Sequence, residues 1–210
     1  LDTITDPVGS NAATIALQQT SVPQVIGFEQ ELNASQKSMS SISSLLSTLS
    51  DLVTQAQDPN NTLADLKSQF DAIVTALNNK FSAASVTLPD GTSGNLLLNG
   101  ANDTVSAVLT DTGKTVTINR YDTSGLQNYI TNAQNAFAAI TSSSDESNIL
   151  TAQSALFVAI DQATTVSDSI ATDITNLQST TSSTVFAATL NTTAILQGQQ
   201  SVDDGLSRIA

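Results

Sequence analysis

The segment from Val25 to Ala56 constrains the fold more than any other part of the chain, because its seam residues recur at alternating steps of three and four. This heptad spacing is typical of a helix that packs lengthwise against other helices. A helix of about 30 residues is about 45 Å long, far beyond the average of about three turns. The sequence therefore predicts a rod. The seam consists of Val25, Phe28, Leu32, Ser35, Met39, Ile42, Leu46, Leu49, Val53 and Ala56.

A helix-start signal precedes this seam. Asp6 can accept hydrogen bonds from a first helical turn, and Pro7 suits the first helical position because it has no N–H group to leave unpaired. We expect the helix to begin at Pro7. Pro23 removes an interior backbone hydrogen bond, so we expect a kink or break near residues 20–23. The seam should stop before Pro59, because a residue that precedes proline is disfavoured in the helical region.

A second helix is predicted to begin at Thr62, where the hydroxyl can cap the first turn and Asp65 can reach back in a capping box. We expect this helix to end near Lys80 and Phe81. Its stripe consists of Leu63, Leu66, Phe70, Ile73 and Leu77.

The residues from 84 to 122 change to a strand-like alternation. Val116 and Ile118 alternate with polar residues, and Gly113 stands where a hairpin turn needs a positive φ. Because an isolated hairpin is marginally stable in water, this one should lie against the helices or pair with the segment 95–98.

The rest of the chain reads as helix, first from about residue 126 to 140 and then, without a proline, from about 147 to 206. The last segment would be about 90 Å long if continuous. A break near Thr181–Thr184 would halve it, because serine and β-branched residues weaken a helix. We expect Leu32, Met39, Ile42, Leu46 and Leu49 to pack against Leu156, Ile160, Ile170, Ile174 and Leu177.

These patterns predict a mainly α fold, an elongated antiparallel helical bundle or coiled-coil rod with a small β-hairpin insert. Residues 1–81 would form the N-terminal helical half of the rod domain and residues 126–210 its C-terminal half. Residues 82–125 would form the small β insert between them.

Composition excludes several function classes. The formal charge is −13, and the six Lys and Arg residues stand singly, so neither nucleic acid nor an anionic membrane surface is an expected partner. No apolar run approaches the roughly 20 residues that span a bilayer. The chain has no His and no Cys, which removes the commonest base, zinc ligands and nucleophile. We expect no enzyme activity, no cofactor and no metal site.

The remaining polar motifs favour structural interpretations. Asp161, Asp168 and Asp173 on the last helix are predicted to form a solvated acidic face, because no enclosing pocket is evident there. The loops 89–95 and 99–104 lack the acid-rich spacing and closing Glu of a calcium loop, which favours turn chemistry. Abundant Ser, Thr, Asn and Gln, at positions that intracellular helical proteins fill with Lys and Glu, indicate an extracellular assembly.

The order of these motifs resembles that of bacterial flagellins. It comprises a DPVG helix start, a long heptad helix, a shorter returning helix, a β region with GNLLLNG, and a long final helix ending in SVDDGLSRIA. Within the family, TDPVGSNAATIAL is most similar to the hook–filament junction protein, also called hook-associated protein 3, since filament flagellins more often have a DDAAG-like string there. The likeness covers nearly the whole chain and is strongest at residues 5–57, 92–100 and 145–210.

The resemblance implies an extracellular structural subunit of the bacterial flagellum, which serves motility and is exported through the flagellar secretion system. Its implied partners are other axial proteins (hook-associated protein, flagellin and copies of itself) and a secretion chaperone for a C-terminal arm. It also implies that both terminal arms, which pair as a coiled coil in the family, lie beyond this sequence.

Two alternatives stay open. A filament flagellin is one, because junction proteins often carry a larger β domain than residues 82–125 can supply. The family's receptor-recognised stretch is Arg-bearing in many flagellins, whereas the matching residues 46–55 have no Arg, so recognition by an innate immune receptor does not follow. The other alternative is a secreted coiled-coil adhesin or secretion-tip binding module, and an enzyme with paired carboxylates is the least favoured interpretation.

Overall fold

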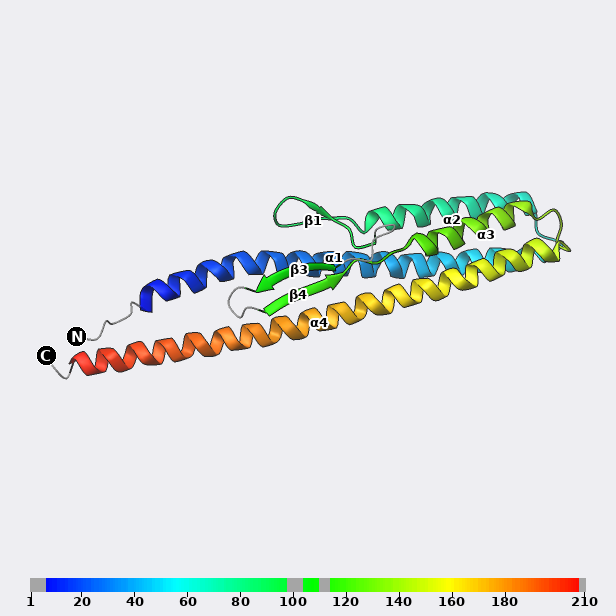
Figure 1. The fold of residues 1–210 in the computed structure, drawn as a ribbon. Coiled ribbons are helices and arrows are strands. Elements are labelled where there is room, and N and C mark those ends of the chain that lie inside the picture. The colour runs from blue at the N-terminus through cyan, green and yellow to red at the C-terminus, as the bar shows by residue number, and fades with distance from the viewer. Residues whose placement is uncertain (1–6, 98–103, 110–113, 208–210) are drawn as a thin grey trace.

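The computed structural model describes residues 7–97, 104–109 and 114–207, and the side chains of residues 24–97, 104–106 and 115–181. Four helices dominate the described residues: α1 (Pro7–Gln55), α2 (Leu63–Ala83), α3 (Ser124–Ala139) and α4 (Glu146–Ser207). They form an elongated rod, with α1 and α4 running antiparallel along its length (Figure 1). The fold is therefore a mainly α antiparallel bundle, as the heptad pattern predicts.

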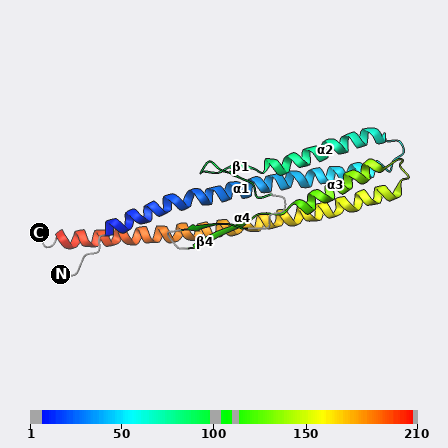
Figure 2. The same cartoon turned by 45° about the horizontal axis from the view of Figure 1, so that its top comes forward.

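The rod has two sections of different thickness. At one end α1 packs against α2 and α4, and α3 packs against α2 and α4, which closes a four-helix bundle. Toward the other end only α1 and α4 continue, a difference that both views show (Figures 1 and 2). With 49 residues in α1 and 62 in α4, these helices are about 74 Å and about 93 Å long.

The break expected near residues 20–23 is absent, because α1 is one helix through Pro23. An interior proline removes a single backbone bond while the bonds of the flanking turns persist, so the helix can continue past it. Figure 1 shows α1 curving toward its N-terminal end. A break near Thr181–Thr184 is absent too, since α4 is continuous there. The Thr181 hydroxyl donates to the Leu177 carbonyl at 2.7 Å, which keeps this side chain within the helical turn.

The capping box predicted for α2 is wrong. Thr62 has the extended backbone of an N-cap residue, but its side chain forms no cap hydrogen bond. Instead the backbone N–H groups of Asp65 and Leu66 donate to the Thr62 carbonyl at 3.1 Å. The helix also continues past its predicted end to Ala83, because Phe81 is still buried in the core.

Two separate strand pairs connect α2 to α3. β1 (Val86–Thr87) pairs antiparallel with β2 (Ser93–Gly94), and β3 (Thr104–Leu109) pairs antiparallel with β4 (Lys114–Asn119). The β3–β4 hairpin lies against α1 and α4, which is the first of the two predicted arrangements (Figure 1). Its predicted turn at Gly113 lies outside the described residues.

One continuous apolar cluster joins the four helices. Phe70 of α2 and Phe137 of α3 stack with ring centroids 4.4 Å apart. The Lys67 ammonium donates to the carbonyls of Ala138 and Ile140, both at 2.7 Å. A cation at these carbonyls complements the C-terminal end of the α3 dipole, so α2 and α3 are joined by both apolar and polar contacts.

Candidate functional site

The ten residues that the sequence analysis singles out for packing lie on α1 and α4, and all belong to the common apolar cluster or pack against it. Eight of them are at most 4% exposed, which removes their side chains from water. Ile160 and Ile174 are partly buried and pack against the same cluster. The eight buried members are Leu32, Met39, Ile42, Leu46, Leu49, Leu156, Ile170 and Leu177. Of the predicted helix start, Pro7 begins α1, and Asp6 lies outside the described residues.

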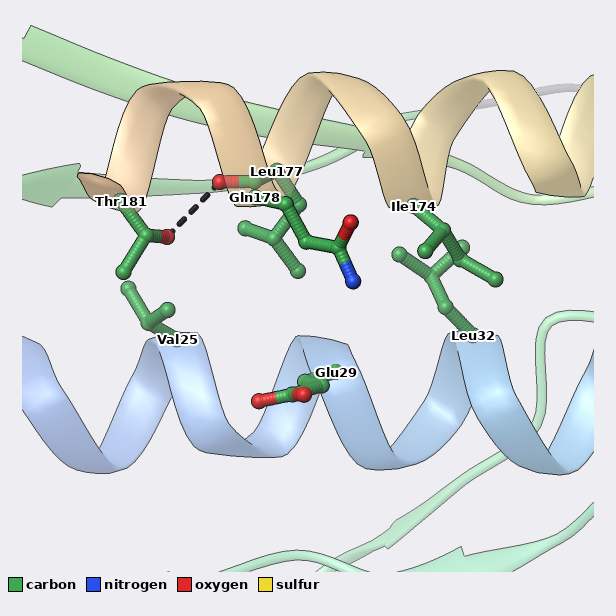
Figure 3. Close-up of a pocket in the computed structure, with 7 residues that line it drawn as sticks. All are labelled: Val25, Glu29, Leu32, Ile174, Leu177, Gln178 and Thr181. Carbon is green, nitrogen blue, oxygen red and sulfur yellow. Dashed lines mark hydrogen bonds between the residues drawn. The ribbon is translucent and has the colours of Figure 1, made fainter. Parts of the chain in front are cut away.

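The two helices meet in an antiparallel register. Figure 3 shows Leu32 of α1 facing Ile174 of α4, and Val25 lying near Thr181. Farther along the seam, the Gln36 amide donates to the Ser167 hydroxyl at 3.1 Å. This register lets the apolar stripes of α1 and α4 face each other over many turns.

The seam also contains polar atoms. The Ser35 hydroxyl and the Gln36 side-chain carbonyl oxygen are buried, and neither has a hydrogen-bond partner among the described residues. Leaving such a group unpaired costs about 1–3 kcal/mol. These two residues are therefore a local weak point in an otherwise apolar contact.

A groove opens on the seam where α1 and α4 continue without α2 and α3. Its volume is about 190 Å³. Glu29 and Gln178 supply its polar rim, and both are exposed (Figure 3). A single exposed carboxylate beside an amide is not an acid–base pair, so the groove offers packing surface rather than chemistry. It is lined by Val25, Glu29, Leu32, Ile174, Leu177, Gln178 and Thr181.

A group of three polar residues, here called the Asp173 clasp, attaches the β3–β4 hairpin to α4. The Asp173 carboxylate is only 8% exposed. One of its oxygens accepts from the Asn119 backbone N–H at 3.0 Å and from the Asn119 side-chain amide at 2.9 Å. The same oxygen accepts from the Tyr121 hydroxyl at 2.7 Å. Three donors from one end of the hairpin thus converge on one carboxylate of α4.

The clasp keeps Tyr121 protonated. Burial raises the pKa of the Tyr121 hydroxyl well above its usual value, and the hydrogen bond to Asp173 and the negative charge of Asp173 raise it further. The hydroxyl is therefore a permanent donor at physiological pH, not an acid or a base. The arrangement positions the hairpin and performs no proton transfer.

The predicted solvated acidic face is wrong for one of its three members. Asp161 and Asp168 are exposed, but Asp173 is buried in the clasp. Asp173 stands three residues after Ile170 and four before Leu177, which is the spacing of the seam itself. That spacing is the signal that identifies it as a candidate buried carboxylate.

A second buried carboxylate lies on α1. Glu31 is 5% exposed, and a Cβ atom at Gly94 of β2 would overlap its carboxylate. Burial raises the pKa of the Glu31 carboxyl, and the nearby charge of Arg120 opposes that rise. Glu31 therefore sits where the β1–β2 pair meets α1, and a side chain at position 94 would require the Glu31 carboxylate to shift.

The loop 89–95 forms a turn, as predicted. The Asp90 carboxylate accepts from the Thr92 N–H at 2.9 Å and from the Thr92 hydroxyl at 2.6 Å. These hydrogen bonds lower the pKa of Asp90. Gly91 takes a φ of 82°, which L side chains rarely adopt. Most of the second loop, 99–104, lies outside the described residues. Within the described part of the chain, no group of three or more His, Cys, Asp or Glu side chains is arranged to hold a metal ion.

One stretch of α4, Glu146–Thr181, is long and apolar enough by composition to cross a membrane. The sequence has no unbroken apolar run of sufficient length, which is why it predicts no such stretch. In this stretch polar residues are scattered among many Ala, Ile, Leu and Val residues, so its mean hydropathy is high although the run is interrupted. A core helix of a soluble protein passes the same test, and this stretch packs against α1 and α3. The finding is weak support for a membrane span.

Comparison with known proteins identifies the fold. No protein-family model matches the sequence, and no curated protein matches it. Among solved structures, the flagellin of Bacillus cereus is similar to this chain with a TM-score of 0.54 and 18% identity, over 73% of this chain and 84% of that one. The two long helices, the shorter returning helices and the small β region thus form a flagellin-like fold.

Proposed function

We propose that this chain is a structural subunit of the bacterial flagellum, a hook–filament junction protein that packs with neighbouring subunits in the axial assembly and has no enzymatic role. The observation that carries the proposal is the flagellin-like fold, which extends over most of both chains. The motif order and the TDPVGSNAATIAL string support the junction role in particular. A rod stabilised by a long apolar seam suits a structural subunit of a polymer.

The proposal includes an extracellular location and export through the flagellar secretion system. Its partners would be other axial proteins, namely hook-associated protein, flagellin and further copies of this chain, together with a secretion chaperone. Residues 1–81 and 126–210 would act as the two halves of one rod domain, with residues 82–125 as its insert. The ten seam residues would have a packing role in that rod.

A filament flagellin is the second candidate. It is favoured by the name of the similar structure, which is a flagellin. The small β region also favours a filament flagellin. Among the described strands between α2 and α3, β1 and β2 have two residues each, and β3 and β4 have six residues each. The two candidates differ in where the protein lies along the flagellum.

Immunogold electron microscopy of flagella from the bacterium that encodes this chain separates the candidates. An antibody raised against the purified chain should label the boundary between hook and filament. Labelling along the whole filament would replace the junction role by that of a filament flagellin. Labelling of the cell surface alone would favour the secreted adhesin and overturn the flagellar proposal. Antibody that has been absorbed with the purified chain is the control.

A further inference from the structure

An exposed apolar patch lies on the outer face of α4. Phe157 is 74% exposed and Leu150 is 54% exposed. Few other large apolar side chains are exposed among the described residues. They are seven residues apart with the exposed Ser154 between them, so all three lie on one helical face. Exposed Glu146 and Asp161 continue the same face at steps of four. This α4 patch therefore has an apolar centre and an acidic residue at each end.

A groove of complementary character lies between α1 and α2. It is open and has a volume of about 550 Å³. Lys37 and Lys80 stand at its rim, and neither forms an ion pair with a carboxylate of the described residues. Leu45 gives it an apolar surface, and the rest is built from small serines, which leave room for a larger side chain. The groove is lined by Lys37, Ser40, Ser41, Ser44, Leu45 and Lys80.

We propose that the α4 patch of one copy of this chain docks into the α1–α2 groove of a second copy. Phe157 and Leu150 would cover Leu45 and the groove serines, and Asp161, at one acidic end of the patch, would meet Lys37 and Lys80, which line the same groove. Aromatic anchors seated in pockets dominate the energetics of protein contacts, and opposite charges at the rim fix their register.

Charge is the reason to choose a second copy as the occupant. At a net charge of −13, copies of the chain repel each other, and a contact that brings the few cations against carboxylates offsets part of that repulsion. The groove holds two of the six basic residues of the chain. The acid-ended patch is the described surface that complements it in both charge and polarity.

The positions of the two surfaces predict a head-to-tail series of copies, a ring or an open array, rather than a two-fold dimer. In the bundle α4 packs against α1 and α3, and α2 lies across from it (Figure 2). The outer face of α4 therefore points away from the α1–α2 side, so one copy can use its patch and its groove at the same time. Such a heterologous contact repeats from copy to copy. The inference deepens the proposed function, on which it rests, by naming a surface through which subunits pack.

Cysteine cross-linking tests the contact directly, because the chain has no Cys of its own. One preparation carries Ser154→Cys in the patch and the other carries Ser40→Cys in the groove. Mixed under mild oxidation at high protein concentration, they should form a mixed disulfide about tenfold faster than Ser154→Cys mixed with Ser68→Cys, an exposed position of α2 outside the groove. Phe157→Ala in the patch copy should lower the rate to that of the control.

A charge exchange sharpens the test. Lys37→Glu in the groove copy should abolish the excess cross-linking, and Asp161→Lys in the patch copy should restore it, because opposite charges then face each other again. Circular dichroism checks that each variant is folded. Equal rates for the groove and control pairs would overturn the inference, as would a dominant disulfide between two Ser154→Cys copies. Junction labelling without cross-linking leaves the proposed function standing, and cross-linking without flagellar labelling leaves only the contact.

Discussion

The α1–α4 seam and the Asp173 clasp hold the molecule together in opposite ways. The seam spreads its stabilisation over many apolar side chains. The clasp concentrates three donors on one carboxylate, and these bonds fix one end of the hairpin against α4. Apolar burial is non-directional and scales with area, whereas hydrogen bonds are directional. The seam therefore determines whether the rod folds, and the clasp determines where the hairpin lies.

The largest effect is expected from Leu46→Ala in the seam. Leu46 is fully buried, so its truncation removes apolar contacts and leaves a cavity, at a cost of about 2–5 kcal/mol. Urea unfolding followed by circular dichroism measures the loss. Leu150→Ala, at an exposed position of α4, is the matched control and should change the stability by less than about 0.5 kcal/mol. Equal free energies of unfolding for the two variants would show that Leu46 is not a core residue.

Asp173→Ala should have a smaller and more local effect. It removes hydrogen bonds to a charged group and leaves the Tyr121 hydroxyl unpaired, which costs about 1.5–3 kcal/mol. Hydrogen exchange of the Asn119 amide should accelerate, while amides in the α1–α4 seam change only as much as the global stability does. Asp173→Asn keeps one acceptor oxygen, so its exchange rate at the Asn119 amide should lie between those of the wild type and Asp173→Ala. Uniform acceleration across seam and hairpin would remove the distinction between the two regions.

Tyr121→Phe tests one bond of the clasp and its pH dependence. At neutral pH the lost hydrogen bond should cost about 1 kcal/mol. Because the folded-state pKa of Tyr121 is raised above its unfolded value, its contribution is fully present below about pH 10 and is lost as the pH rises further. Stability should therefore fall less steeply above pH 10 in the variant than in the wild type. Tyr129→Phe controls for the loss of a tyrosine, and identical slopes for Tyr121→Phe and the wild type would contradict the prediction.

The smallest effect is expected from Glu31→Gln. Burial raises the folded-state pKa of Glu31, so the contribution of this carboxyl is fully present below its unfolded pKa of about 4.3 and is lost as the pH rises through the folded value. The stability of Glu31→Gln relative to wild type should increase from pH 4 to pH 7. Glu29→Gln removes the same charge from an exposed position of α1 and is the control. A relative stability that does not change with pH would place Glu31 in water.

The buried stripe of α1 can be predicted from the sequence, whereas the clasp cannot. Heptad spacing is a local property of a continuous stretch of sequence, so the stripe through Leu32, Met39 and Leu46 can be identified from the residues alone. The clasp joins Asn119 and Tyr121 to a residue more than fifty positions away, and no local pattern reports such a pairing. The general tendency of aspartate to be solvated assigns Asp173 to the surface, although its spacing matches the seam.

Two further errors have a physical cause in common. The break at Pro23 and the cap at Thr62 are both predicted from local preferences, whose energies are only about 1–3 kcal/mol. Packing along α1 or α2 involves many residues and outweighs a preference of that size. Local signals therefore locate the helices correctly but fail where a single residue is expected to interrupt or cap one.

The unequal thickness of the rod has a mechanical consequence. Resistance to bending rises faster than cross-section, so the section with four helices is stiff and the section with only α1 and α4 bends first under a lateral load (Figure 1). The β3–β4 hairpin contacts both α1 and α4, and it lies where the rod becomes thinner. Because Asp173 holds one end of the hairpin, the hairpin connects α1 and α4 at this position. A force applied to the thin section of the rod is therefore passed on to the thick section.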